Sequence, residues 1–172
     1  MTGRSNALRV PLLQYVLGMM LDETIQSANR FFSVLSRGRY ALQHKQGKSG
    51  AGYGGLDIEV LDVMSGTCRS VETLSGGEQF LASLSLAFGL SDVVQSYSGA
   101  VRLDSIFIDE GFGSLDTDTL DTAMRALESI RQSGRVVGII SHVSELQSRI
   151  PTMIRIWKTA SGSAAAKVIA ED

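Results

Sequence analysis

Apolar residues near the start of the chain recur at helical spacing. Five of them follow one another at intervals of four and three: Leu21, Ile25, Ala28, Phe32 and Leu35. An α-helix turns once every 3.6 residues, so this spacing puts the five side chains on one face. The pattern predicts one long helix over residues 8–36, which Gly38 would end.

The next segment has the alternation of a strand. Leu56, Ile58 and Val60 alternate with Asp57 and Glu59, as expected for a strand with one wet face. We predict strands over residues 39–43 and 56–62. Residues 47–55, with five glycines, would connect them. A turn at residues 65–66 would lead to a third short strand over 67–73, which completes a β meander.

From residue 75 onwards the pattern changes again. Residues 78–95 are apolar nearly all round, which predicts a buried helix. Residues 103–109 and 135–141 contain unbroken apolar runs, typical of buried parallel strands. An amphipathic segment over 117–133 lies between them, and this strand–helix–strand order favours a parallel α/β sheet. Residues 153–158 and 165–170 predict a closing β-hairpin.

The helix over residues 78–95 begins with a motif that suits a phosphate. Ser75 and Glu78 have the spacing of a capping box. Gly76 and Gly77 leave backbone N–H groups unshielded at the helix start, where the helix dipole favours an anion. An ordinary capped helix after a turn explains the same residues equally well.

Two acids follow the first buried strand. Asp109 and Glu110 stand at its carboxyl end, where ligands bind in open α/β sheets. Asp109 could hold Mg²⁺, and Glu110 could polarise a water for attack on a γ-phosphate. The alternative is a pair of solvated acids in a turn.

Two further candidate residues follow these acids in the sequence. Asp116 would cap the next helix. His142 follows the second buried strand, so it lies at the same edge as Asp109 and could hydrogen-bond a phosphate oxygen. A structural or merely exposed histidine is the usual alternative.

A loop that would grip the β- and γ-phosphates is missing from this sequence. Gly47, Lys48 and Ser49 resemble the end of such a loop, but Leu42 occupies the position of its first glycine. We interpret these residues as part of the glycine-rich connection.

The composition of the chain excludes several classes of protein and of binding site. The net charge of −2 gives no global basic field for DNA binding. The single cysteine, Cys68, excludes an internal disulfide framework and a multi-cysteine zinc site, and it fits a reducing cytoplasm. The apolar residues 10–21 are interrupted by polar ones and followed by two acids, so we expect neither a signal peptide nor a membrane span.

Taken together, four motifs resemble those of ABC ATPases. They are the signature motif (residues 74–79), Walker B (106–110), the D-loop (114–116) and the H-loop (141–142). Within that superfamily the chain resembles the SbcC family. That likeness is carried by residues 28–29, 38–40, 90–95, 109–116 and 138–143.

The resemblance implies an α/β fold, the C-terminal half of an ABC-type ATPase head. Residues 1–37 would form the base of a coiled coil, 38–73 a β meander, and 74–172 the part with the four motifs. Such heads pair around two ATP molecules. Ser75, Gly76 and Gly77 would then touch the γ-phosphate of ATP held by the opposite head, and Glu78 would belong to the same nucleotide-binding motif.

The resemblance also assigns the remaining roles. Asp109 would orient Mg²⁺, Glu110 would activate water, His142 would sense the γ-phosphate, and Asp116 would bridge the two heads. ATP and Mg²⁺ are the implied cofactors. The chain would need the N-terminal half of the same protein for its phosphate loop, and alone it would be inactive.

The implied partners are a second SbcC-like head, an SbcD-like metal-dependent nuclease subunit, and double-stranded DNA. The complex would cut double-stranded ends and hairpins during repair, in the cytoplasm. Three alternatives remain open at this point: a head of the SMC or RecN kind, a transporter nucleotide-binding domain, and a structural module that does not hydrolyse ATP.

Overall fold

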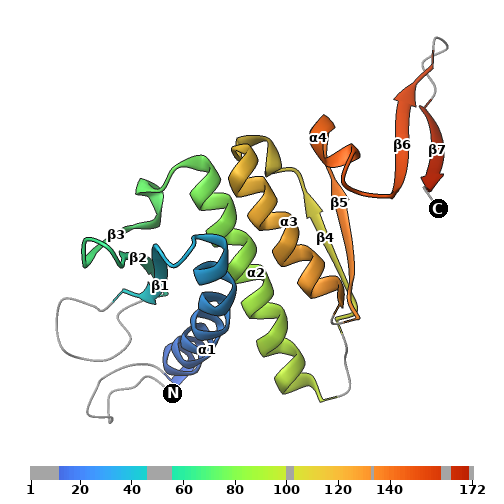
Figure 1. Cartoon of the computed structure of the whole chain (residues 1–172). Helices are drawn as coiled ribbons and strands as arrows, with labels where there is room; N and C mark the ends of the chain where they lie inside the picture. The colour runs from blue at the N-terminus through green and yellow to red at the C-terminus, as the bar shows by residue number, and fades with distance from the viewer. Residues whose placement is uncertain (1–11, 46–55, 100–102, 133, 160–163, 171–172) are drawn as a thin grey trace.

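The computed structural model describes residues 12–45, 56–99, 103–132, 134–159 and 164–170. Two long helices, α1 (Leu12–Leu35) and α2 (Gly76–Ser98), lie side by side at its centre. A small antiparallel sheet lies beside one end of this pair, and the helix α3 with two parallel strands lies on the other side (Figure 1).

The end of α1 follows the sequence prediction closely. Arg37 and Gly38 have φ values of +53° and +77°, the left-handed conformation that terminates many helices. The Gly38 N–H donates to the Ser33 carbonyl at 2.7 Å. The predicted stop at Gly38 is therefore confirmed, while residues 8–11 of the predicted helix lie outside the described ranges.

The predicted β meander is confirmed. β1 (Tyr40–His44), β2 (Ile58–Asp62) and β3 (Thr67–Ser70) form an antiparallel sheet in that order. The last residues of the predicted third strand instead form a 3₁₀ helix, η1 (Val71–Thr73), because the Ser70 hydroxyl accepts a hydrogen bond from the Glu72 N–H. The glycine-rich residues 47–55 lie outside the described ranges.

Close contact between α1 and α2 forms the centre of the core. A Cβ placed on Gly89 would lie 2.6 Å from both the Ala28 nitrogen and the Thr24 carbonyl oxygen. Only glycine permits this approach. Phe32 and Phe88 are fully buried where the two helices meet. Because Gly89 has no side chain, the backbones of α1 and α2 come into direct contact at this point.

The parallel sheet is present as two strands. β4 (Ser105–Asp109) and β5 (Val136–Ile140) are parallel, and α3 (Thr117–Gln132) connects them. Ile108 packs in the same core as Leu120 and Leu127 of α3, and α3 lies across one face of the strands (Figure 1). The predicted strand–helix–strand unit is confirmed.

The predicted burial of these strands was wrong for one face. Phe107 is 73% exposed, and Val136 and Ile140 are exposed as well. Successive side chains of a strand point to opposite faces, and within the described residues α3 covers only one of them. Leu90 departs from the prediction in the same way, because it is exposed in a helix that was predicted to be buried.

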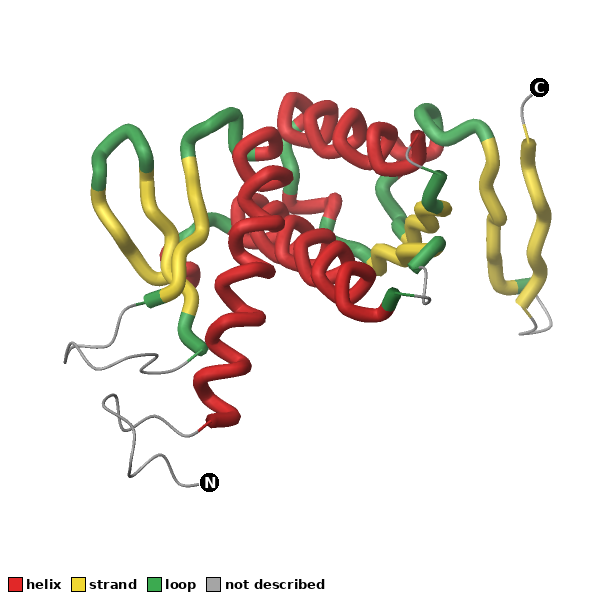
Figure 2. Tube along the Cα trace, turned by 90° about the horizontal axis from the view of Figure 1, so that it is seen from below, coloured by secondary structure: helices red, strands yellow, loops and turns green. Residues whose placement is uncertain are grey.

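The chain ends in a hairpin that stands apart from the helices. A short helix, α4 (Ser144–Gln147), follows β5, and then β6 (Thr152–Lys158) pairs antiparallel with β7 (Ala164–Ala170). Figure 2 shows this hairpin beside the body of the molecule. The predicted closing hairpin is confirmed. Within the described ranges, no helix has both the length and the apolar character needed to cross a membrane.

Candidate functional site

The N-terminus of α2 carries the predicted capping box. The Ser75 hydroxyl accepts from the Glu78 N–H at 3.3 Å, and the Glu78 carboxylate accepts from the Ser75 N–H at 2.9 Å. Gly76 and Gly77 are the first two helical residues. Their backbone N–H groups have no partner within the helix, so this end can attract an anion.

Glu78 is also tied to the meander, a contact that the sequence patterns did not predict. The Tyr40 hydroxyl donates to Glu78 Oε1 at 2.8 Å, and Arg69 donates to the Tyr40 oxygen at 3.1 Å. Burial works to raise the pKa of Glu78, but hydrogen bonds from the Ser75 backbone and the Tyr40 hydroxyl outweigh it. The pKa therefore lies below its ordinary value of 4.5.

Asp116 caps α3, as its position in the sequence predicted. Its carboxylate accepts from the Thr119 N–H at 2.9 Å and from the Thr119 hydroxyl at 2.8 Å. These two hydrogen bonds lower the pKa of Asp116. Just before it, a short 3₁₀ helix, η2 (Phe112–Ser114), connects β4 to α3.

The signature and D-loop residues share one hollow of about 440 Å³. A Cβ on Gly77 would meet the Ser114 carbonyl oxygen at 3.1 Å, so the two segments are in contact. Arg37 and Arg39, from the turn between α1 and β1, add positive charge to the lining. The predicted site residues among those that line the hollow are Ser75, Gly77, Glu78 and Asp116.

A second group gathers at the carboxyl ends of β4 and β5. Asp109 is the last residue of β4, and Glu110 follows it with a φ of +60°. The Glu110 carboxylate oxygen Oε2 lies 2.9 Å from Nδ1 of His142. The Glu110 and His142 side chains are 48% and 82% exposed, respectively, so both can be reached from solvent. Asp109, Glu110 and His142 do not line the hollow of the first group.

The backbone around Glu110 is held in an uncommon conformation. The Glu110 N–H donates to the Ile140 carbonyl at 2.9 Å, which continues the pairing of the two strands. Gly111 has a φ of +97°, and a Cβ there would collide with the Phe80 ring. The left-handed turn thus lies directly against α2, where Phe80 packs on Phe112 at 4.9 Å between ring centroids.

Asp109 suits a magnesium ion that is held jointly with a nucleotide. Its side chain is exposed and makes no hydrogen bond or ion pair with another described residue. Among the residues that the structure describes, no three His, Cys, Asp or Glu side chains lie close enough together to hold a metal ion by themselves. Mg²⁺ commonly takes one or two carboxylates, with phosphates and waters as its other ligands.

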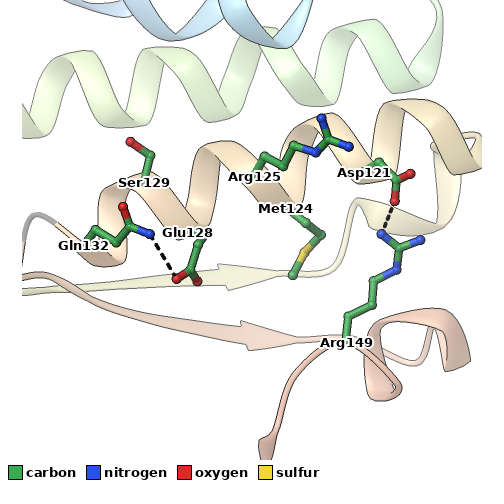
Figure 3. Close-up of a pocket in the computed structure, with 7 residues that line it drawn as sticks. All are labelled: Asp121, Met124, Arg125, Glu128, Ser129, Gln132 and Arg149. Atoms are coloured by element: carbon green, nitrogen blue, oxygen red, sulfur yellow. Dashed lines mark hydrogen bonds and ion pairs between the residues drawn. The ribbon is translucent and has the colours of Figure 1, made fainter.

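Another hollow, of about 490 Å³, contains no predicted site residue. It lies on α3 near the start of the closing segment (Figure 3). Arg149 reaches across from the chain after α4 to Asp121 on α3. None of the residues that line this hollow belongs to the four motifs.

Comparison with known proteins gives the family. Residues 56–129 match the family model described as SbcC/RAD50-like, Walker B motif. The SbcC subunit of nuclease SbcCD from Vibrio cholerae is 50% identical over 162 residues, which cover 94% of this chain and 16% of that relative. The Staphylococcus aureus protein of the same name is 47% identical over 154 residues, 90% of this chain and 15% of its own. The chain therefore spans about a sixth of the length of these relatives.

Solved structures give the same fold. An SMC ATPase, from work on ATP-driven dimerization and DNA-stimulated activation, aligns with a TM-score of 0.67 and 16% identity, over 91% of this chain and 89% of that one. The SMC head domain from Thermotoga maritima aligns with a TM-score of 0.57 and 17% identity, over 92% and 52%. The fold is that of an SMC-type, ABC-class ATPase head, and the chain belongs to the SbcC/RAD50-like family, as a segment that carries the family's Walker B region.

Proposed function

We propose that this chain supplies the signature, Walker B, D-loop and H-loop parts of the ATPase head in an SbcC-like protein. The observation that carries the proposal is the contact between Glu110 and His142 beside Asp109, at the carboxyl ends of two parallel strands. Ligands of open α/β sheets bind at this edge. A base beside a metal-binding carboxylate is the arrangement that phosphoryl transfer to water requires.

In this proposal each residue of the second group has one task. Glu110 orients and deprotonates the attacking water. His142 holds the Glu110 carboxylate and donates to the γ-phosphate. Asp109 binds Mg²⁺ directly or through a water. The ion, when bound, would neutralise charge on the β- and γ-phosphates.

The hollow between the signature motif and the D-loop would face a second head. The Ser75 hydroxyl and the N–H groups of Gly76 and Gly77 would contact the γ-phosphate of ATP bound to that head. Glu78 keeps this helix end in shape through the capping box. Asp116 lines the same hollow, and it would bridge the two heads.

The phosphate loop would come from the N-terminal half of the same protein. The outward face of the parallel sheet supports this, since Phe107, Val136 and Ile140 leave an apolar surface uncovered by the described residues. Residues 1–37 would then form the base of a coiled coil, 38–73 the meander, and 74–172 the motif-bearing part. Without the missing loop, this chain would not hydrolyse ATP alone.

The wider partners follow from the relatives. They are named as the SbcC component of the SbcCD nuclease, so we propose an SbcD-like nuclease subunit and double-stranded DNA as partners. Turnover of ATP in the paired heads would drive the processing of double-strand ends and hairpins.

The test uses the full-length protein with Glu110→Gln. We expect ATP turnover to be lost, because the amide cannot accept the proton, while ATP-dependent pairing of heads persists. Glu128→Gln, an exposed acid on α3, serves as the control and should leave turnover unchanged. Normal turnover by Glu110→Gln would refute the base assignment. Absence of turnover in the unaltered protein would favour a structural module.

A further inference from the structure

The segment that carries His142 is short and has little to hold it in place by itself. His142 is followed by α4, which contains only four residues and has no side-chain cap at its N-terminus. A single helical turn is not stable alone. The position of His142 therefore depends on contacts between this segment and the rest of the molecule.

Apolar contacts fix one side of the segment. Leu146 is buried, and Val143 packs near the turn after β4, where a Cβ on Gly113 would lie 3.7 Å from Val143 Cγ2. These side chains anchor α4 to the core. They leave the other side of α4 and the chain that follows it at the surface.

One arginine fixes that other side. Arg149 donates to Glu145 of α4 at 2.9 Å, and its other terminal nitrogen bonds Asp121 of α3. Figure 3 shows its side chain crossing from the chain after α4 to the helix. Glu145 lies three residues after His142, and Asp121 lies five residues after Asp116. Arg149 thus joins the segment of His142 to the helix that begins at the D-loop.

We propose that Arg149 is a positioning residue for ATP hydrolysis, which holds α4 against α3 and so keeps His142 within reach of Glu110. This inference rests on the proposed function. Arg149 itself does not touch Ser75, Asp109, Glu110 or His142 through any described hydrogen bond or ion pair. Its guanidinium can bind two carboxylates at once, which a lysine ammonium cannot do with the same geometry.

The test measures ATP turnover by the full-length protein with Arg149→Met. We expect kcat to fall on the order of tenfold, because a small displacement of a group at the reacting atoms is costly. The KM for ATP should change little, since Arg149 contacts no residue proposed to bind the nucleotide. Arg149→Lys should recover part of the rate. An unchanged kcat in Arg149→Met would overturn the inference.

The chain offers a matched control on the same helix. Arg131 pairs with Glu128 at 2.6 Å within α3 and does not reach α4. Arg131→Met therefore removes a comparable surface ion pair without loosening α4, and kcat should stay at the level of the unaltered protein. An equal fall of kcat in both variants would mean a general effect of losing charge from α3 and would overturn the inference.

A double variant separates this inference from the function on which it rests. If Arg149 acts through His142, adding Arg149→Met to His142→Ala should cause no further loss of kcat. Losses that multiply would show that Arg149 acts independently and would overturn the inference. If His142→Ala alone leaves kcat unchanged, the proposed role of His142 fails, and the positioning role of Arg149 fails with it.

Discussion

Nδ1 of His142 lies 2.9 Å from Oε2 of Glu110, across the carboxyl ends of two neighbouring parallel strands. The strand register explains the contact. Asp109 pairs with Ile140, so the residues that follow each strand leave the sheet side by side. A slip of one residue between β4 and β5 would move one strand end along the other by about 3.3 Å and so separate Glu110 from His142. The register of the sheet thus determines whether the proposed site exists.

Removing the His142 imidazole should slow the chemical step. In the full-length protein we expect His142→Ala to lower kcat about 10²-fold, because the water-activating carboxylate loses its neighbour and the γ-phosphate loses a donor. Steady-state ATPase assays measure this. His44→Ala is the control, since His44 pairs with Asp22 away from the motifs. Comparable losses of kcat in both variants would contradict the assignment.

A bulky cation at the start of α2 should prevent head pairing. In Ser75→Arg the long side chain would fill the place proposed for the γ-phosphate, so ATP-dependent dimers should disappear in light scattering. Ser75→Ala should pair but lose about 1 kcal/mol of stability with its cap. Ser129→Arg, an exposed change on α3, is the control. Persistent dimers of Ser75→Arg would argue against the role of the signature motif.

The Tyr40–Glu78 hydrogen bond should make stability depend on pH at both extremes. The lowered pKa of Glu78 stabilises the fold above its ordinary value of 4.5, and that contribution is lost as pH falls through the lowered pKa. Burial and the bond to Glu78 raise the pKa of Tyr40 above 10.0. Its contribution is present below pH 10 and is lost as pH rises through the raised pKa.

Tyr40→Phe tests this dependence. The free energy of unfolding at neutral pH should fall by about 1 kcal/mol, and the alkaline loss should become smaller. Urea unfolding of this chain across the pH range measures both effects. Tyr15→Phe is the control, because Tyr15 lies on α1 at an exposed position. If the free energy of unfolding falls at alkaline pH as much in Tyr40→Phe as in the unaltered chain, the Tyr40–Glu78 hydrogen bond does not cause the pH dependence.

Gly89→Ala should destabilise the chain although alanine is the better helix former. Its Cβ would meet backbone atoms of Thr24 and Ala28, which cannot rotate away as a side chain would. We expect a loss of about 3 kcal/mol from the forced separation of the helices. Leu90→Ala, at the exposed neighbouring position, should cost much less. Thermal unfolding compares the two, and equal losses would mean that the close crossing is unimportant.

Local patterns in the sequence predicted much of this fold. The capping box of Ser75 and Glu78, the stop at Gly38 and the strand–helix–strand unit each depend on residues close together in the chain, and each is confirmed. The roles proposed for Asp109, Glu110, Asp116 and His142 stay predictions. The grouping of Asp109, Glu110 and His142 at the strand ends followed from the rule for parallel sheets.

Contacts between distant segments could not be predicted in the same way. No local pattern pairs Tyr40 with Glu78, or Arg149 with Asp121, because such contacts depend on how whole elements pack. The apolar run around Phe107 predicted burial correctly for Ile108 and wrongly for Phe107 itself. A hydrophobic run indicates that a strand can be buried, but it does not identify the element that packs on each of its faces.

Because of the left-handed backbone at Glu110, selection for stability and selection for ATP turnover should favour different residues at this position. A φ of +60° is strained for a glutamate and easy for glycine. Library screening for heat resistance alone should therefore enrich Gly at position 110, where it relaxes the turn and removes the carboxylate. Only screening for turnover would retain the glutamate.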